Sequence, residues 1–291
     1  MAASANSTSG TMSEHNLGIG GMTLHYATWG QPAGPERTVV LVHGLTANSR
    51  GWALLGPTLA ARGWHVIAPD LRGRGLSSKP AHGYGVPFHA NDILALCDAL
   101  ALPSVSVVGH SLGAVIGLYL VALYPQRVSR LVMVDAGGKI PEDTAQAIAA
   151  SVGRLGMPFP SLDAYLGAMR QLPMIQWNDL WEAYFRYDAE EHADGTVTSR
   201  VPKAAIAEES WALGALRSEA LPDFVKRPTL VLRAALGTLG PDRGIVLPRE
   251  EAERLGRVIP DCQVVEIPET NHYTIIASPA FIEAVAAFLA G

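Results

Sequence analysis

The amino-acid sequence predicts an α/β fold: a doubly wound, mostly parallel eight-stranded sheet with helices on both faces and a helical cap insertion. Short uncharged runs rich in Val, Ile and Leu alternate along the chain with segments of helical spacing, which is typical of a buried parallel sheet. The alternation stops after Asp135 and resumes near Thr229. The helical patterns between these two points therefore predict an insertion into the core.

Composition and charge indicate a globular protein and argue against nucleic acid as its partner. Of the 291 residues, 48% are apolar and 17% are charged, so a large core is expected and disorder is not. The net charge of −5 provides no basic surface for nucleic acid. Cys97 and Cys262 lie in different predicted elements and lack metal-binding spacing, so we expect ordinary thiols and no metal site.

The N-terminal residues 1–14 are small and polar and are expected to form a disordered tail. They have neither the basic start nor the apolar centre of a signal peptide. The longest apolar runs fall well short of the roughly eighteen residues of a membrane helix. The sequence therefore predicts a cytoplasmic protein that does not bind a membrane.

The first part of the core is predicted for residues 15–136. It begins with an antiparallel hairpin around Gly20 and Gly21, and Asn48 is suited to cap the helix that follows the next strand. The predicted strands cover residues 16–19, 22–29, 38–43, 64–70, 105–110 and 128–135, and the predicted helices cover 49–62, 88–100 and 112–124.

The second part of the core is predicted for residues 222–291, with strands at 229–233 and 262–267 and helices at 248–258 and 279–289. The insertion, residues 137–221, shows helical patterns at 141–155, 161–172, 177–191 and 202–217 and no convincing strand. We interpret it as a cap over the strand ends. Three of its many aromatic residues, Trp177, Trp181 and Tyr184, are candidates for lining a substrate pocket.

The motif Gly109-His-Ser-Leu-Gly113 lies between a buried strand and an amphipathic helix. This context predicts a nucleophile elbow, a sharp turn that raises the Ser111 hydroxyl above the sheet edge. Glycines two residues before and after Ser111 are required because strand and helix nearly touch there. The sequence therefore predicts Ser111 as a nucleophile.

A serine hydroxyl needs an adjacent base, and His272 is the best of the nine histidines. It follows the last predicted strand, at the sheet edge where the carboxyl ends of the strands gather. His43 is expected to order the loop beneath the site, and His110 to pack away from Ser111. Little can be said of His192, which lies in the insertion.

The acid that orients His272 has two candidates. Asp242 lies between the penultimate strand and its helix and completes the chain order Ser, Asp, His, although it comes late in a long loop. Asp135 ends the strand after the elbow. We prefer Asp242, keep Asp135 as the alternative, and expect Asp70 to be structural. The backbone N–H groups of Leu45 and Leu112 are the expected oxyanion donors.

Together these residues resemble the α/β-hydrolase superfamily. The resemblance runs from about Leu17 to Gly291 and is carried by His43-Gly44 and by the segments 70–75, 109–113 and 271–272. It is greatest for the capped serine esterases, lactonases and C–C-bond hydrolases, which use a Ser-His-Asp triad and no cofactor. In two places the chain departs from that group: the loop before Asp242 is longer than usual, and the segment after His272 is apolar.

The resemblance implies a serine hydrolase that cleaves a carboxylic ester through an acyl-enzyme on Ser111. A lactonase or C–C-bond hydrolase with the same triad is the alternative, and a non-catalytic small-molecule receptor on the same fold is a third hypothesis. Dehalogenases and epoxide hydrolases of this fold need an aspartate where Ser111 stands. The natural substrate and the oligomeric state are not indicated.

Overall fold

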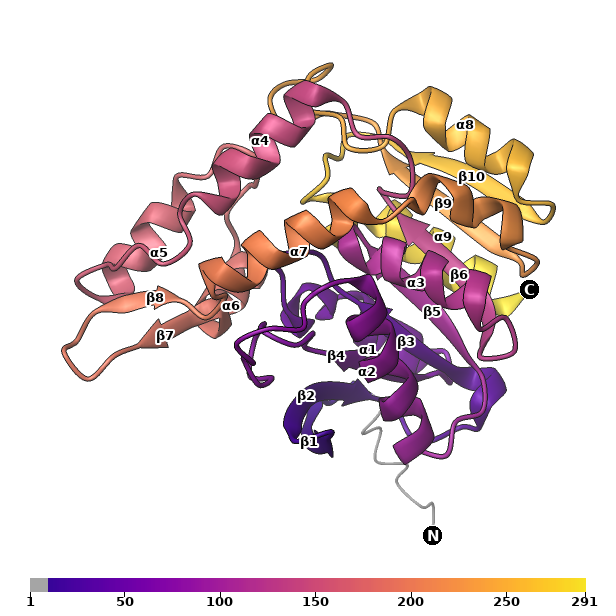
Figure 1. Ribbon diagram of the computed structural model, residues 1–291, viewed down its shortest axis with the longest axis horizontal. Coiled ribbons are helices and arrows are strands. Elements are labelled where there is room, and N and C mark those ends of the chain that lie inside the picture. The colour runs from indigo at the N-terminus through magenta and orange to yellow at the C-terminus, as the bar shows by residue number, and fades with distance from the viewer. Residues whose placement is uncertain (1–9) are drawn as a thin grey trace, which may run out of the picture.

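The computed structural model describes residues 10–291, and its main element is one eight-stranded sheet (Figure 1). The strand order is β1-β2-β4-β3-β5-β6-β9-β10. The β1–β2 and β2–β4 pairs are antiparallel, and the pairs from β4 to β10 are parallel. The predicted fold class, including the edge hairpin, is confirmed.

The strands of this sheet are β1 (Ser13–Ile19), β2 (Met22–Trp29), β3 (Thr38–Val42), β4 (His65–Pro69), β5 (Val105–His110), β6 (Val128–Val134), β9 (Thr229–Ala234) and β10 (Cys262–Ile267). The core helices are α1 (Leu55–Ala61), α2 (Val86–Ala99), α3 (Leu112–Leu123), α8 (Arg249–Val258) and α9 (Pro279–Ala290). Short 3₁₀ helices are η1 (Pro35–Arg37), η2 (Ser49–Trp52), η3 (Ser218–Phe224) and η4 (Ile275–Ala277).

Strand β3 shows why the sheet is covered on both faces. All five of its side chains are buried, and successive side chains point to opposite faces. Val39 and Leu41 join α1 and α9 in one apolar cluster. Val40 and Val42 join α2, α3 and α8 in another. An uninterrupted apolar run is therefore what a strand between two helical layers requires.

The insertion between β6 and β9 contains the four predicted helices, α4 (Glu142–Val152), α5 (Leu162–Arg170), α6 (Asp179–Asp188) and α7 (Lys203–Ala215). They lie to one side of the sheet, and α7 runs back toward the core (Figure 1). The prediction missed a small antiparallel hairpin, β7 (Ala189–Glu191) with β8 (Val197–Ser199). Strands of three residues are too short to show an alternating pattern.

Two boundaries differ from the prediction. Strand β1 begins at Ser13 and pairs with β2 along its length, so the end of the predicted tail belongs to the sheet; residues 1–9 lie outside the described part. The helix predicted at 49–62 is divided into η2 and α1, and the Asn48 side chain accepts the Arg50 N–H at 3.0 Å as its cap. Within residues 10–291, no helix has the length and apolar character needed to cross a membrane.

Candidate active site

Ser111 lies at the junction of β5 and α3, in a strained turn. Its φ and ψ are 55° and −119°, a region that residues with a side chain rarely occupy. The turn is held by the Ser111 N–H, which donates to the Val134 carbonyl of β6 at 3.0 Å. The surrounding backbone thus maintains a conformation that points the hydroxyl out of the sheet edge.

The two glycines of the motif permit backbone contacts that no other residue would allow. A β-carbon on Gly109 would lie far inside contact distance of the Gly113 carbonyl group. One on Gly113 would collide in the same way with the carbonyl of Val42. Strand β5, helix α3 and strand β3 therefore approach one another so closely that both positions must be glycine.

His272 lies between Ser111 and Asp135. Its Nε2 is 3.0 Å from Ser111 Oγ, and its Nδ1 is 2.8 Å from Asp135 Oδ2. Because an ionised carboxylate is only an acceptor, Nδ1 carries the proton and Nε2 is left to accept the serine hydroxyl. The imidazole is thus oriented as a base toward Ser111.

Asp135 is fixed at both oxygens. It directly follows β6 with φ 51° and is almost fully buried. Its Oδ1 accepts the Ala234 N–H at 2.9 Å, and its own N–H donates to Leu232 at 2.7 Å. The second oxygen remains for His272. A carboxylate held in this way can orient the imidazole and stabilise its cationic form.

The preference for Asp242 is corrected by this geometry. Asp242 is exposed and lines an open surface cleft together with Arg233 and Arg249. The loop that carries it closes on itself, because the Thr238 N–H and the Gly244 carbonyl are bonded at 3.1 Å. Asp242 therefore lies on a compact surface turn, whereas Asp135 is a single residue beyond a buried strand.

The two residues predicted to supply backbone donors for the oxyanion lie in segments next to Ser111. Leu112 is the first residue of α3, where a helix leaves its N–H groups without intrahelical partners. Leu45 follows Gly44, whose ideal β-carbon position is 3.1 Å from the Ser111 β-carbon. The loop after β3 therefore passes directly beside the serine, where a β-carbon at position 44 would be a tight fit.

His43 orders this loop, as predicted, and its tautomer follows from its partners. Its Nε2 accepts the Leu71 N–H at 3.0 Å, so Nδ1 carries the proton and donates to the Gly44 carbonyl at 2.8 Å. Burial lowers the pKa of His43 to about 4, since charging it inside the core costs free energy. A neutral, fixed imidazole thus supports the Gly44–Leu45 peptide.

His110 has a supporting contact that the sequence did not reveal. Its Nε2–H donates to the His272 carbonyl at 2.9 Å, and the two rings lie with centroids 4.6 Å apart. Burial is the main cause that holds the pKa of His110 well below its ordinary value. His192 is remote from this group and bonds Thr198 in the exposed hairpin.

The buried Asp70 carboxylate joins three segments of the chain through hydrogen bonds. Its carboxylate accepts the Ser49 N–H at 2.8 Å, the Leu76 N–H at 3.0 Å and the Tyr187 hydroxyl at 2.5 Å. Burial alone would raise the pKa of Asp70, but hydrogen bonds, first among them one from His25, lower it to about 2. Because Tyr187 belongs to α6, its hydrogen bond to Asp70 also connects the insertion to the core.

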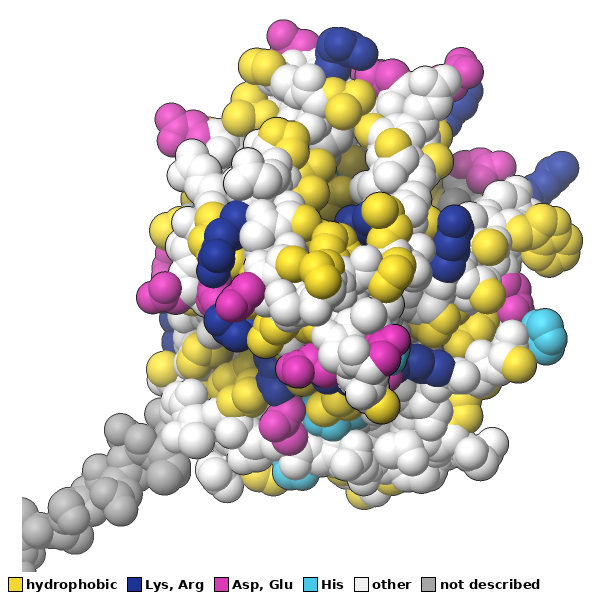
Figure 2. Space-filling model, turned by 90° about the vertical axis from the view of Figure 1, so that its left-hand side faces the viewer, with side chains coloured by type: hydrophobic (Ala, Val, Ile, Leu, Met, Phe, Trp, Pro, Cys, Tyr) yellow, Lys and Arg dark blue, Asp and Glu magenta, His cyan; other side chains and the backbone are white. Residues whose placement is uncertain are grey.

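The three aromatic candidates of the insertion have different surroundings. Trp177 stacks on Phe185 and donates its Nε1–H to Glu182. Trp181 is buried in the large apolar cluster. The Tyr184 ring lies near Gly51 in η2, which the Ile276 side chain also approaches. Figure 2, which faces the insertion, shows apolar side chains gathered around a recess between its segments.

Among residues 10–291, no group of three or more His, Cys, Asp or Glu side chains is arranged to hold a metal ion.

Comparison with known proteins gives consistent results. Residues 37–279 match the family model described as the alpha/beta hydrolase fold. The chain is 30% identical to 2-(acetamidomethylene)succinate hydrolase of Mesorhizobium japonicum, over 90% of this chain and 89% of that protein. It is also 30% identical to 3-hydroxybutyrate-oligomer hydrolase of Cupriavidus necator, over 92% of this chain and 93% of that protein. The crystal structure of E-2-(acetamidomethylene)succinate hydrolase superposes with a TM-score of 0.85 at 27% identity, covering 97% of this chain and 100% of that one.

Proposed function

Since the chain belongs to the α/β-hydrolase fold family, we propose that it hydrolyses a carboxylic ester through an acyl-enzyme on Ser111. The observation that carries this proposal is the continuous line of hydrogen-bonding contacts from Ser111 to His272 to Asp135. It connects a strained, half-buried nucleophile, a base held in one orientation and a buried acid, which is the constellation that acyl transfer requires.

In the acylation step, the Ser111 hydroxyl gives its proton to His272 Nε2 as Oγ attacks the ester carbonyl. The carbonyl oxygen becomes an anion, and the N–H groups of Leu45 and Leu112 stabilise it. The imidazolium that forms is stabilised by Asp135 through Nδ1. When the tetrahedral intermediate collapses, Nε2 returns the proton to the departing alcohol, and the acyl group remains on Oγ.

In the deacylation step, a water molecule takes the place of the alcohol. His272 Nε2 removes one of its protons as the oxygen attacks the acyl carbonyl, and the same two N–H groups receive the second oxyanion. Collapse releases the carboxylic acid and returns the proton to Ser111. The imidazole thus acts twice as base and twice as acid, for which its fixed tautomer is essential.

The insertion, residues 137–221, acts in this proposal as a cap that covers the acyl pocket. Three contacts between the insertion and core segments at the carboxyl ends of the strands support this role. They are Tyr184 near Gly51, Tyr187 on Asp70, and the Asn271 side chain, which donates to the Met174 carbonyl at 2.8 Å. Asn271 immediately precedes His272. A cap bonded beside the base can shape the pocket and exclude water from it.

The test of this proposal is steady-state hydrolysis of p-nitrophenyl esters together with covalent labelling. We expect turnover by the wild type and a single phosphonate adduct on Ser111. Ser111→Ala should lower kcat by several orders of magnitude, on the order of 10⁶ as for a triad nucleophile, with an unchanged circular-dichroism spectrum. Labelling of another residue, or an active alanine variant, would refute the proposal; binding without turnover would favour a receptor.

A second candidate is hydrolysis of a non-ester acyl compound by the same triad. It is favoured by the resemblance to 2-(acetamidomethylene)succinate hydrolase in both sequence and structure. Assaying that compound beside the esters separates the two hypotheses. If it is the better substrate, kcat/KM should exceed the ester value while Ser111→Ala still abolishes both reactions. Lactones and C–C substrates belong in the same comparison.

A further inference from the structure

Helix α7 of the insertion presents two buried residues to the loop that carries Leu45. Ile206 and Glu209 are three positions apart, so they lie on the same face of the helix, and both are fully buried. Leu45 itself contacts this face: its side chain packs against the apolar cluster of Leu155, Val201 and Ile206. The first contact between α7 and the loop after β3 that carries Leu45 (the oxyanion loop) is thus apolar.

The second contact is a buried ion pair. The Arg74 guanidinium, with no exposed surface, donates through Nη2 to Glu209 Oε2 at 3.1 Å. The same oxygen accepts Nε2–H of His89 at 2.5 Å. A buried cation that lost its anionic partner would be left uncompensated. The position of Arg74 therefore depends on Glu209, a residue of the insertion.

Arg74 also contacts the oxyanion loop. Its Nε donates to the Leu45 carbonyl at 2.9 Å, and its Nη1 donates to the Arg72 carbonyl at 2.9 Å. On the other side of Leu45, the Gly44 carbonyl accepts Nδ1–H of His43 at 2.8 Å. His43 thus holds the planar peptide that contains the Leu45 N–H, and Arg74 holds the next peptide, which contains the Leu45 carbonyl.

We propose that Glu209 and Arg74 are positioning residues that couple the docking of helix α7 to the formation of the oxyanion hole. With α7 docked, Glu209 holds Arg74, Arg74 holds the Leu45 carbonyl, and the Leu45 N–H faces the oxyanion. When the pair is broken, the Leu45 carbonyl loses its donor, His43 alone holds the loop, and the Leu45 N–H is less precisely placed. This inference rests on the proposed function, because Leu45 acts on the oxyanion of that reaction.

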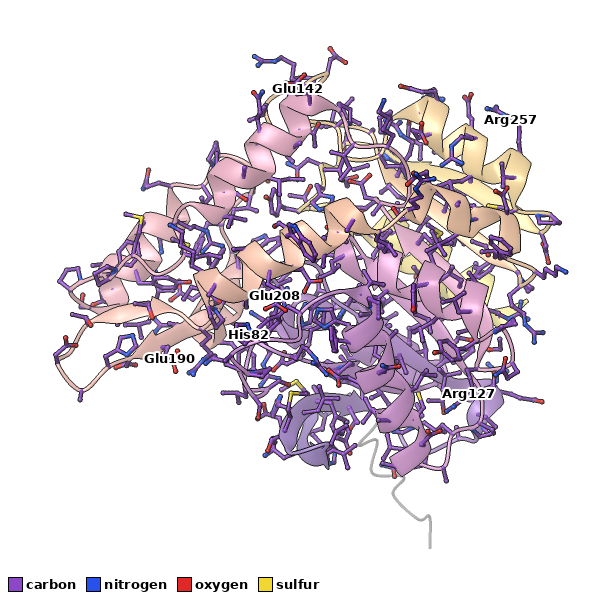
Figure 3. All side chains as sticks on the ribbon, in the orientation of Figure 1. His82, Arg127, Glu142, Glu190, Glu208 and Arg257 are labelled. Atoms are coloured by element: carbon purple, nitrogen blue, oxygen red, sulfur yellow. The ribbon has the colours of Figure 1, made fainter. Side chains whose placement is uncertain are left out.

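The experiment compares Glu209→Gln with Glu208→Gln on the same helix. Glu208 points from α7 toward the loop of His82 (Figure 3) and accepts the N–H groups of Gly83 and Tyr84 at 2.9 and 3.0 Å. It thus ties α7 to the core without reaching Leu45. We expect Glu209→Gln to lower kcat by roughly 10- to 100-fold with little change in KM, as for a misplaced oxyanion donor. Glu208→Gln should stay within about twofold of the wild-type kcat.

A trifluoromethyl ketone separates positioning from general destabilisation. It forms a tetrahedral adduct on Ser111 whose oxyanion needs both N–H donors, so its affinity should fall in Glu209→Gln by about the same factor as kcat. Hydrogen exchange of residues 43–49 should also accelerate in Glu209→Gln and remain slow in Glu208→Gln. Equal effects of the two substitutions on kcat, or unchanged exchange in that segment, would overturn the inference.

The variant R74M/E209M keeps the test valid if Glu209→Gln does not fold. Replacing both charges by apolar side chains is often tolerated, so we expect its melting temperature to exceed that of Glu209→Gln. The Leu45 carbonyl still lacks its donor, so kcat should remain low; a wild-type kcat would refute the role of Arg74. Failure of the proposed function shows separately, as absent wild-type turnover and absent Ser111 labelling, while the exchange of residues 43–49 does not depend on activity.

Discussion

At the scale of the residue, the site depends on side chains whose hydrogen-bonding capacity is nearly filled. Asp135 uses one oxygen for the Ala234 N–H and the other for His272. Such a carboxylate is ordered before the reaction begins, so little reorganisation is needed when positive charge develops on the imidazole. An exposed carboxylate such as Asp242 would have to give up water for each of these contacts.

The first prediction follows from this difference. Asp135→Asn should lower kcat for p-nitrophenyl esters by about 10⁴, because an amide can donate to Nδ1 and stabilise the wrong tautomer of His272. Asp242→Asn should remain within about twofold of the wild type, as surface substitutions usually do. Steady-state kinetics of both variants decide the matter, and the reverse order of effects would reinstate Asp242 as the acid.

His43 provides a prediction about pH and stability. Its pKa is about 4 in the folded protein because burial penalises the charged form, against about 6.5 in an unfolded chain. Between these values the unfolded state binds more protons, so the free energy of unfolding falls as the pH falls through that window, in total by about 3 kcal/mol for this residue. Above about pH 6.5 the stabilisation is fully present.

The measurement compares the wild type with His43→Asn, which can still donate to the Gly44 carbonyl but does not titrate. Urea unfolding at about pH 7 and about pH 4.5 should show the stability gap between the two proteins narrowing by about 2 kcal/mol at the lower pH. Titratable groups that do not interact with His43 behave alike in both proteins and cancel in the difference. A stability gap of the same size at both pH values would contradict the lowered pKa of His43 in the folded protein.

At the scale of the element, the elbow is limited by backbone contacts. Gly113 lies where α3 crosses the end of β3, and an added β-carbon would meet the Val42 carbonyl. Gly167 lies in α5, and the same atom there would have nothing within 4 Å. The two glycines thus form a matched pair: both are helical, but backbone closely surrounds only the first.

We therefore expect opposite effects of the same substitution at these two positions. Gly113→Ala should cost more than about 3 kcal/mol of unfolding free energy or prevent folding, because backbone must move. Gly167→Ala should stabilise the protein by roughly 0.5–1 kcal/mol through lower entropy of the unfolded chain. Urea titrations monitored by circular dichroism test both, and a well-folded, active Gly113→Ala would disprove the close-contact argument.

Two aromatic residues of α6, Trp181 and Tyr184, have different surroundings and give different predictions. Trp181 is only 6% exposed, so Trp181→Ala should cost about 3–5 kcal/mol, as expected for a large core truncation. The Tyr184 ring lies near Gly51, in the segment that follows β3. Tyr184→Ala should change the ratio of kcat/KM between butyrate and octanoate esters more than it changes the melting temperature. A large loss of melting temperature with an unchanged ratio would make Tyr184 a packing residue too.

At the scale of the whole molecule, the sequence was most informative where pattern and position coincide. Apolar runs gave the sheet, and the elbow motif with His272 in the last loop gave residues that the fold brings together. The choice of acid failed because chain order is satisfied by Asp135 and Asp242 alike, and only the path of the 237–244 loop separates them. The contacts of His110 and Arg74 join distant segments, which no local pattern encodes.

The core and the insertion share one apolar cluster, which bears on how the chain unfolds. This cluster contains Trp52 and Leu232 from the core and Tyr165, Trp181 and Phe185 from the insertion. Neither part buries its share of this surface alone. Chains of this length often unfold through intermediates, but here separation of the insertion would expose core side chains and break the Glu209–Arg74 pair at the same time.

The last prediction is that the insertion and the core unfold in a single transition. The triple variant in which Trp177, Trp181 and Trp211 become phenylalanine retains only Trp29, Trp52 and Trp64, so its fluorescence comes from tryptophans of the core alone. Far-UV circular dichroism of the same variant reports from all helices. Because both parts lose their shared cluster together, the two probes should give the same urea midpoint, which is the signature of two-state unfolding. If the helical signal were lost at lower urea than the fluorescence signal, the insertion would be an independently melting unit, and its coupling to the oxyanion loop would have to be weak.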